Sequence, residues 1–366
     1  MSAPTGRQDE VLKALSIVMD PDLNKNIVEL GFIKDLKIDG GNVSFEIELT
    51  TPACPVKEQL KQEAEDAVSA LKWTDKLEIT MTAQVQAAVP MEGAMKIRNI
   101  IAVASGKGGV GKSTVSANLA FALSEAGASV GILDADIYGP SMPLMLGLGQ
   151  AQPKTTTDEN GQTRMFPFER NGVKVMSMGF LVPPEKAMIW RGPMVHGALQ
   201  QFFGQVEWGE LDYLVIDLPP GTGDAQLTMT QTVPVSGAVI VTTPQDVAMI
   251  DAKKAYNMFA ETNVPILGIV ENMSFFECPN CNHESHIFGH DGARVWAEEL
   301  NVRFLGKIPI DLKIREHGDD GTPAVIAKDT PDRVRKAFKT IAEQAASEIS
   351  MRNHAKGENA PLELSN

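Results

Sequence analysis

Residues 105–114 read Ser105-Gly106-Lys107-Gly108-Gly109-Val110-Gly111-Lys112-Ser113-Thr114, a glycine-rich run with a lysine near each end. The apolar segment Asn99 to Ala104 before it predicts a buried strand, and Thr114 to Ser124 after it predicts a helix. In this context the glycines let backbone N–H groups close around phosphates, and Lys112 can reach the β- and γ-phosphate oxygens. The Ser113 hydroxyl can bind Mg²⁺ at the helix N-terminus. The sequence therefore predicts a nucleoside triphosphate site formed by Gly106 to Thr114.

Three aspartates follow two further predicted strands. Val130 to Leu133 runs into Asp134-Ala135-Asp136, and Tyr213 to Ile216 runs into Asp217. Because parallel strands deliver their carboxyl ends to one crevice, we expect all three carboxylates at the mouth of the phosphate loop. A single aspartate at the end of a strand can also cap a helix. Two strand ends that both carry aspartate at the same edge of the sheet favour phosphate chemistry instead. The predicted fold class is α/β, a mostly parallel P-loop NTPase sheet flanked by helices and preceded by a small α/β domain.

The length of 366 residues and a hydrophobic share of 43% predict two folded domains. Between them lies an alanine-rich stretch with little periodic pattern, which predicts a linker, and the chain ends in a polar stretch that predicts disorder. The predicted organisation is a small domain over residues 1–83, a linker over 84–95, a nucleotide-binding domain over 96–352 and a disordered tail over 353–366.

Local patterns refine this organisation. Val43 to Leu49 alternates between apolar and polar residues and predicts a half-buried strand of the small domain. Ala151 to Arg170 is polar and rich in turn residues, so we expect it to lie outside the main sheet. Pro331 to Met351 carries a narrow apolar stripe with mixed charges opposite, which indicates a helix that packs on the core rather than a basic membrane-binding helix.

Charge and hydropathy exclude several classes of function. The formal net charge is −14, which argues against general affinity for nucleic acid or anionic membrane, although a local basic face stays possible. No apolar run approaches the roughly 18 residues of a membrane-spanning helix, and the first residues lack the apolar stretch of a secretory signal. We expect a cytoplasmic protein with no nucleic-acid or membrane partner.

Three cysteines, Cys54, Cys278 and Cys281, are too few for a disulfide framework. The two-residue spacing within Cys278-Pro279-Asn280-Cys281 lets both thiolates bind one metal or cluster. One chain supplies two ligands, and a symmetric dimer would complete four. That set fits a [4Fe–4S] cluster as well as zinc, and residue chemistry alone slightly favours zinc. His283 and His286 lie within reach but are better explained as loop residues.

The extra lysine, Lys107, makes the phosphate loop resemble the deviant form of the MinD, ParA and nitrogenase-iron-protein ATPases. The resemblance implies a homodimer in which ATP is sandwiched and Lys107 reaches the partner's nucleotide; a solvated loop lysine is the alternative. It also implies that Asp136 orients the attacking water and that Asp217 holds Mg²⁺ through its water shell, with Asp134 suited to either role. Lys107, Lys112 and Asp136 are thus the expected catalytic residues. Residues 218–224 resemble the switch that senses the γ-phosphate.

Adenine recognition follows from the same resemblance. Ile266 to Val270 runs into Glu271-Asn272, and Arg303 to Lys307 runs toward Pro309 and Asp311. Both places resemble the base-contact points of this ATPase class, so Asn272, Pro309 and Asp311 are expected at the base. The Asn272 amide both donates and accepts, as a purine edge requires. No guanine-type Asn-Lys-x-Asp run is evident, and ATP over GTP is an implication of the resemblance.

Six motifs together resemble the Mrp/ApbC family of iron–sulfur cluster carrier ATPases. They are Gly106 to Thr114, Asp134 to Ser141, Trp190-Arg191-Gly192-Pro193, Asp217 to Asp224, Glu271-Asn272-Met273-Ser274 and Cys278-Pro279-Asn280-Cys281. The resemblance implies a labile [4Fe–4S] cluster bridging two subunits of a homodimer at Cys278 and Cys281. It further implies delivery of this cluster to apo iron–sulfur proteins and slow hydrolysis of ATP with Mg²⁺.

The N-terminal domain resembles the small domain of iron–sulfur assembly factors through Asp20-Pro21-Asp22, Ile27 to Gly31 and Thr50 to Pro55. Cys54 falls just before a predicted helix whose first position could be Pro55, and a helix N-terminus favours a thiolate. A transient cluster ligand or a handover thiol is one interpretation. A small buried hydrophobic residue is an equally good one.

Two other classes of function compete with a cluster carrier. A partition-type ATPase that positions cargo would carry a basic surface or a basic terminal helix, and neither is evident. A zinc-stapled dimeric ATPase scaffold without transfer activity would use the same cysteines for a different metal.

Overall fold

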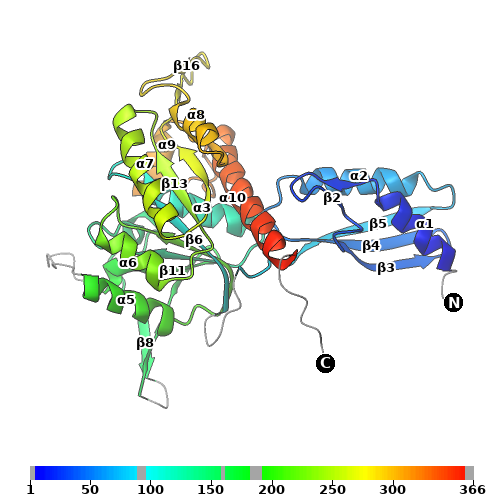
Figure 1. Cartoon of the computed structure of the whole chain (residues 1–366), viewed down its shortest axis with the longest axis horizontal. Coiled ribbons are helices and arrows are strands. Elements are labelled where there is room, and N and C mark those ends of the chain that lie inside the picture. The colour runs from blue at the N-terminus through cyan, green and yellow to red at the C-terminus, as the bar shows by residue number, and fades with distance from the viewer. Residues whose placement is uncertain (1–4, 89–95, 158–160, 182–191, 359–366) are drawn as a thin grey trace. The chain divides into compact units, whose positions relative to one another are not determined.

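The computed structural model describes residues 5–88, 96–157, 161–181 and 192–358. The chain divides into two compact units, one formed by residues 1–86 with 346–366 and the other by residues 87–345 (Figure 1). Among the described residues, no helix is both long and apolar enough to span a membrane. The sequence predicts a boundary at residue 83, and the first unit runs to residue 86. The end of the chain from residue 346 also belongs to this unit.

The larger unit is built on an eight-stranded sheet. Its strand order is β10-β11-β7-β12-β6-β13-β14-β17, and only β10 runs antiparallel to its neighbour. The predicted mostly parallel sheet flanked by helices is therefore confirmed. The strands are β6 (Lys96–Ala104), β7 (Val130–Asp134), β10 (Phe168–Arg170), β11 (Val173–Ser177), β12 (Glu210–Asp217), β13 (Gly237–Thr242), β14 (Ile266–Glu271) and β17 (Phe304–Lys307).

Helices cover this sheet because each parallel connection must cross back over it. The helices are α3 (Lys112–Glu125), α4 (Met142–Met145), α5 (Gly192–Gly204), α6 (Asp224–Thr232), α7 (Asp246–Glu261), α8 (Gly292–Glu299), α9 (Leu312–Asp319) and α10 (Asp332–Glu358), with a short 3₁₀ turn η1 (Met178–Phe180). Every residue of β7, β13 and β14 is buried, as expected for central parallel strands.

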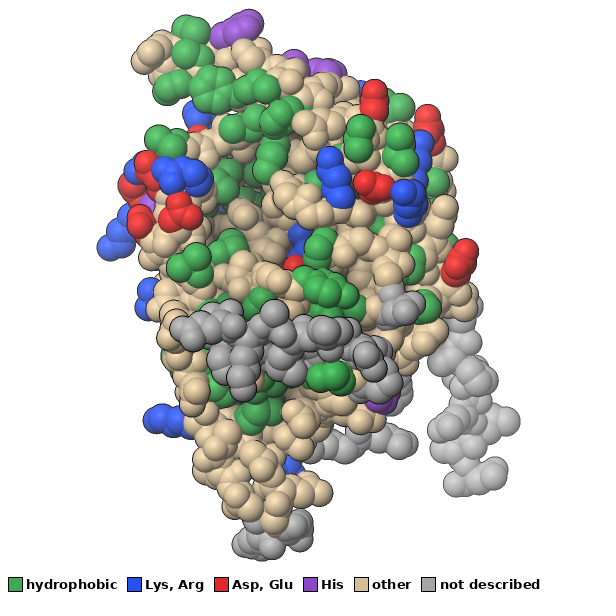
Figure 2. All heavy atoms as spheres, turned by 90° about the vertical axis from the view of Figure 1, so that its left-hand side faces the viewer, with side chains coloured by type: hydrophobic (Ala, Val, Ile, Leu, Met, Phe, Trp, Pro, Cys, Tyr) green, Lys and Arg blue, Asp and Glu red, His purple; other side chains and the backbone are tan. Residues whose placement is uncertain are grey.

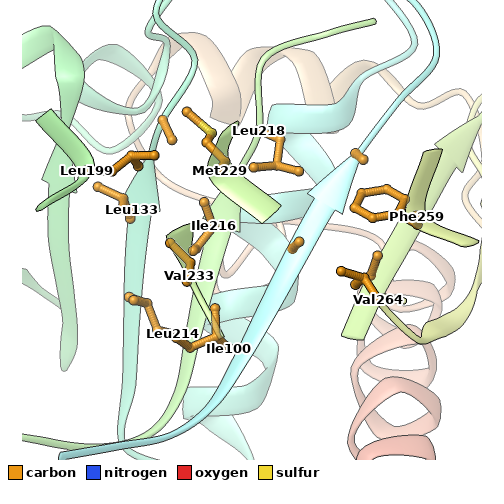
Figure 3. Close-up of a cluster of buried hydrophobic side chains, with 14 of the residues drawn as sticks. Ile100, Leu133, Leu199, Leu214, Ile216, Leu218, Met229, Val233, Phe259 and Val264 are labelled. Carbon is orange, nitrogen blue, oxygen red and sulfur yellow. The ribbon is translucent and has the colours of Figure 1, made fainter. Parts of the chain in front are cut away.

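The core on one side of the sheet joins strand residues to α5, α6 and α7 (Figure 3). Leu199 of α5 and Met229 of α6 pack with side chains of β7 and β12, and Phe259 of α7 lies further along the sheet. Burial of such aliphatic side chains contributes roughly 1.5–3 kcal/mol each. The labelled members Ile100, Leu133, Leu214 and Ile216 come from three adjacent strands. This packing fixes the carboxyl ends of β6, β7 and β12 relative to one another.

The segment Ala151 to Arg170 departs in part from the prediction. β8 (Lys154–Thr157) and β9 (Thr163–Phe166) form a hairpin outside the main sheet, as predicted for this segment. β10, however, joins the sheet, so the prediction is wrong for its residues. The cause is the turn Asn171-Gly172, whose φ values of 46° and 80° suit a two-residue hairpin. Phe168 also packs on Phe180, with ring centroids 4.8 Å apart.

The C-terminal helix α10 confirms one prediction and corrects another. Its apolar stripe is buried, with Val334, Phe338 and Ile341 at most 1% exposed, so it packs on the core as expected. It continues to Glu358, so the predicted disordered tail is wrong for residues 353–358, and the rest of that tail lies outside the described residues. The extension is held by polar contacts, including Asn353 Nδ2 donating to Gln86 O at 3.1 Å.

The smaller unit has a three-stranded sheet in the order β3-β4-β5. β3 and β4 form an antiparallel hairpin, and β5 pairs parallel to β4. The predicted alternation from Val43 to Leu49 is confirmed, because Val43, Phe45, Ile47 and Leu49 are at most 3% exposed. The elements are α1 (Thr5–Leu15), β1 (Met19–Asp20), β2 (Lys25–Asn26), β3 (Ile33–Asp39), β4 (Asn42–Leu49), α2 (Lys57–Ser69) and β5 (Lys76–Ala83).

The first part of the predicted linker is ordered against its neighbours. Gln84 N donates to Leu49 O at 2.8 Å, and Val85 is 5% exposed. Ala88 N donates to Arg98 O at 3.0 Å. Residues 89–95 lie outside the described residues. The ordered stretch from Gln84 to Ala88 therefore belongs to the folded units rather than to a free linker.

Candidate functional site

The phosphate loop connects β6 to α3 and needs two of its glycines for steric reasons. A Cβ on Gly106 would lie 2.0 Å from the backbone carbon of Asp251, where α7 crosses the loop. A Cβ on Gly111 would lie 2.1 Å from Asn272 Nδ2, and Gly111 has a φ of 82°. Lys107 is half-buried and forms no ion pair with any described residue. The loop is thus shaped by its packing against α7 and Asn272.

A cluster of one lysine and two carboxylates lies beside this loop. Lys112 Nζ is 2.8 Å from Asp217 Oδ1 and 3.6 Å from Asp136 Oδ2. Ser113 Oγ donates to Asp217 Oδ2 at 2.6 Å. These side chains converge because β12 pairs with both β6 and β7, which places Asp217 beside Val103 and Asp134. Hard oxygen donors at Ser113 and Asp217 suit Mg²⁺.

Asp134 has a different environment from Asp136. It is fully buried, and its oxygens accept from Asp136 N at 3.1 Å, Met142 N at 3.0 Å and Ser177 Oγ at 2.9 Å. Burial raises the pKa of Asp134 to about 7, and the negative charge of Asp217 adds to the shift. These contacts show a carboxyl group that holds the loop carrying Asp136. The two roles predicted for Asp134, orienting water and holding Mg²⁺, stay predictions.

The segment following β12 is bonded directly to the phosphate loop. Leu218 N donates to Val103 O and Gly221 N donates to Ser105 O, each at 3.0 Å. Gln226 at the start of α6 is buried and its Nε2 donates to Pro219 O. One main-chain hydrogen bond thus joins this segment to the first residue of the phosphate loop, and a second joins it to β6.

A cavity of about 610 Å³ opens next to the phosphate loop. Asn272 lies on its wall, and its Nδ2 donates to Val110 O at 2.8 Å. Pro309 and Asp311 also line it, but the Asp311 carboxylate accepts from Lys313 N at 2.9 Å and pairs with Arg333 Nη2 at 2.8 Å. Asp311 is thus held by α9 and α10. The remaining lining is largely apolar and includes Met273, Ile287, Phe288, Ile310 and Ile314.

The structure brings the three base-site candidates to one cavity that also touches Gly111 and Thr114. Ile287 and Phe288 were not expected there, because they lie in a loop far along the chain with no local signal. Glu271, which precedes Asn272, is buried and accepts from Ser274 Oγ and Ala293 N, so it supports the fold of this wall. Trp190 and Arg191 of the quoted motifs lie outside the described residues.

The two paired cysteines lie in a hairpin formed by β15 (Phe276–Glu277) and β16 (Glu284–Ser285). Cys278 N donates to His283 O at 3.0 Å, and Asn282 N donates to Cys278 O at 2.9 Å. Cys278 is half-buried and Cys281 is exposed. The backbone N–H of Asn280, and then the N–H and thiol of Cys281, lower the pKa of Cys278, which favours its thiolate.

The hairpin offers two thiols and little else as ligands. Over the described part of the chain, no group of three or more His, Cys, Asp or Glu side chains is placed to hold one metal ion. His283 and His286 are exposed, and the ring of His286 packs edge-on against His290 at 4.1 Å. Two ligands per chain are the arrangement that a shared site between two chains would need.

Cys54 belongs to the smaller unit and packs against its hydrophobic core. The helix after it, α2, begins at Lys57 rather than at Pro55, so the predicted start is wrong. Residues 55 and 56 form a turn instead, in which Lys57 N donates to Cys54 O at 3.3 Å. The thiol therefore lies further from the first helical N–H groups than expected, which weakens the helix argument for its thiolate.

The strand order and the loop between β6 and α3 define the chain as a P-loop NTPase. Residues 96–346 match the family described as NUBPL iron-transfer P-loop NTPase, and residues 8–81 match the family described as iron-sulfur cluster assembly protein. The chain belongs to the NUBPL iron-transfer P-loop NTPase family. The resemblance drawn from the motifs is confirmed.

Similar proteins agree with this membership. The iron-sulfur cluster carrier protein of Synechocystis sp. is 48% identical over 348 residues, which cover 94% of this chain and 98% of that protein. A nucleotide-binding protein from Archaeoglobus fulgidus, solved in complex with ADP, is 44% identical with a TM-score of 0.54 and covers 62% of this chain and 87% of its own. The cell division ATPase MinD of Pyrococcus furiosus is 26% identical with a TM-score of 0.50, covering 68% and 98%.

Proposed function

We propose that this protein binds a [4Fe–4S] cluster between two of its chains and delivers it to apo iron–sulfur proteins, with ATP binding and slow hydrolysis. The observation that carries the proposal is the Cys278–Cys281 hairpin, which offers two thiols with Cys278 favoured as thiolate. A cluster needs four such ligands, and two copies of the hairpin supply them. The family and the similar carrier protein support iron–sulfur chemistry over a zinc staple.

The nucleotide site supplies the ATP part of the proposal. Lys112 would turn from Asp217 to the β- and γ-phosphates, and Ser113 would bind Mg²⁺ with Asp217 behind its water shell. Asp136 would orient the attacking water. Its Oδ1 accepts hydrogen bonds from Tyr138 N and Gly139 N, which fix the carboxylate. The cavity beside Asn272 would take the base, and its apolar lining would stack against the ring.

A homodimer is part of the proposal, and the surface supports it. Leu227 of α6 is 37% exposed, and Val247 and Ile250 of α7 are 64% and 57% exposed. Figure 2 shows hydrophobic side chains gathered around a hollow that holds basic and acidic side chains, on the face turned left in Figure 1. Apolar side chains around a charged hollow suit contact with a second copy that closes over nucleotide. A cytoplasmic location stays a prediction.

Transfer itself is testable with the protein loaded anaerobically. The loaded protein is mixed with an apo acceptor that uses a [4Fe–4S] cluster, the two are separated, and iron and sulfide are measured on each. We expect both to move to the acceptor, with recovery of the acceptor's activity. Retention of all iron on the loaded protein, in the presence and absence of ATP, would leave a scaffold without transfer as the better function.

Replacing Lys107 with alanine is expected to lower hydrolysis by about 10²-fold or more while much of the nucleotide binding is kept, because this lysine acts on the partner's nucleotide. Steady-state phosphate release and binding of a fluorescent ADP analogue measure the two effects. Lys154→Ala, which removes an exposed lysine from β8, is the matched control. Turnover of the Lys107 variant at the control's rate would reduce Lys107 to an ordinary loop lysine.

Replacing Asp136 with alanine is expected to slow hydrolysis by about 10²-fold with ATP affinity nearly unchanged, since positioning of water chiefly lowers the transition-state barrier. The same two assays separate rate from affinity. Asp212→Ala, which removes a partly buried carboxylate paired with Arg98, controls for loss of a carboxylate. If the Asp136 variant no longer bound ATP, Asp136 would be a metal or folding residue.

A further inference from the structure

Ser116 lies within α3, one turn beyond Ser113, and its side chain is fully buried. Its Oγ lies 2.7 Å from Asp217 Oδ1 and 3.0 Å from the main-chain oxygen of Lys112. A hydroxyl has one proton, so it donates to one of these acceptors at a time. The carboxylate is the nearer and the charged acceptor, which makes it the stronger partner.

Asp217 has three side-chain partners among the described residues. Oδ1 accepts from Lys112 Nζ and Ser116 Oγ, and Oδ2 accepts from Ser113 Oγ. Two of these partners, Lys112 and Ser113, are the groups that the proposed function assigns to phosphate and Mg²⁺. When they turn to nucleotide, the fully buried Asp217 carboxylate loses two of its three partners. Ser116 does not belong to the loop and remains.

We propose that Ser116 is a positioning residue that holds Asp217 when nucleotide takes Lys112 and Ser113. With Oδ1 fixed by Ser116, Oδ2 stays directed to the place where Ser113 now lies, which is the metal position in the proposed function. Without Ser116, the carboxylate can rotate, and Oδ2 no longer stays directed to that metal position. The inference rests on the proposed ATP–Mg²⁺ site.

The alternative is a hydroxyl that serves only the helix, by bonding back to the carbonyl of Lys112 four residues earlier. A side chain with that role alone would affect stability and would not change the response to Mg²⁺. The two roles therefore differ in what metal titration shows.

The experiment compares Ser116→Ala with Ser116→Thr, which keeps the hydroxyl, and with Ser124→Ala, a partly buried serine near the end of the same helix. The Mg²⁺ dependence of ATP hydrolysis and the binding of a fluorescent ADP analogue with and without Mg²⁺ are measured for each. We expect Ser116→Ala to raise the Mg²⁺ concentration for half-maximal rate about tenfold, as loss of one hydrogen bond to a charged group should. It should bind the analogue normally without Mg²⁺ and more weakly with it.

Ser116→Thr should restore most of the Mg²⁺ response, and Ser124→Ala should match the unchanged protein. A Ser116→Ala protein with an unchanged Mg²⁺ response in both assays would overturn the inference, whatever its thermal stability. If Ser116→Ala does not fold, Ser116→Cys takes its place, because a thiol is a weaker hydrogen-bond donor than a hydroxyl. A half-maximal Mg²⁺ concentration in Ser116→Cys equal to that of the unchanged protein would also overturn the inference. If the unchanged protein shows no Mg²⁺-dependent binding or hydrolysis, the proposed function fails rather than the role of Ser116.

Discussion

Replacing Lys112 with alanine is expected to reduce ATP turnover by about 10³-fold or more, because this is the cation that neutralises charge on the β- and γ-phosphates. Lys112 is 6% exposed and contacts both Asp217 and Asp136. Its loss also removes the counter-charge that both carboxylates share. Removing one partner of a buried ion pair costs about 3–5 kcal/mol, so the variant is expected to be less stable as well.

The two effects of Lys112→Ala are separated by a second substitution. Combining Lys112→Ala with Asp217→Asn removes one of the uncompensated charges and should recover stability in thermal unfolding without recovering turnover. Phosphate release is measured for both proteins, with Lys154→Ala as the surface control. Turnover by folded Lys112→Ala within tenfold of the control would remove Lys112 from the proposed phosphate site.

Replacing either Cys278 or Cys281 with alanine is expected to abolish cluster binding rather than halve it. Each substitution is doubled by the symmetry of a dimer, so either one removes two of four ligands. Iron and sulfide per chain after anaerobic reconstitution measure the effect. The apo Cys278→Ala protein should still bind the fluorescent ADP analogue, because the hairpin contributes no residue to the cavity wall described above.

Cys54→Ala is the matched control among the cysteines. Cys54 packs against the core of the smaller unit, and a third cysteine per chain is surplus to a site of four thiolates. The cluster should therefore persist in Cys54→Ala. A cluster that survives Cys281→Ala and disappears in Cys54→Ala would overturn the assignment to the hairpin.

The arrangement of the nucleotide site could be predicted from the sequence because it follows from strand ends. Val130 to Leu133 and Tyr213 to Ile216 are apolar runs that end in aspartate, and parallel pairing brings those ends beside the phosphate loop. The sequence did not decide between two roles for Asp134, orienting water and holding Mg²⁺. Its partners Met142 and Ser177 are distant in the chain, so only the folded structure shows that they hold its carboxyl group.

Other differences have similar causes. The hairpin at Asn171-Gly172 carries a local signal that the polarity of the surrounding segment obscured, and β10 was missed for that reason. The extension of α10 into residues 353–358 depends on a partner far away in sequence, since Asn353 Nδ2 donates to Gln86 O at 3.1 Å. A polar composition predicted disorder there because it cannot report such contacts. The apolar cavity wall at Ile287 and Phe288 is likewise a product of folding.

Native mass spectrometry of the anaerobically reconstituted protein tests the central claim most directly, since it reads chain number and bound metal in one spectrum. The account predicts a dimer whose excess mass is that of one [4Fe–4S] cluster. In Cys281→Ala this excess mass should be absent. A dimer that carries zinc without sulfide, or a single chain that carries a complete cluster, would contradict a cluster shared between two Cys278–Cys281 hairpins.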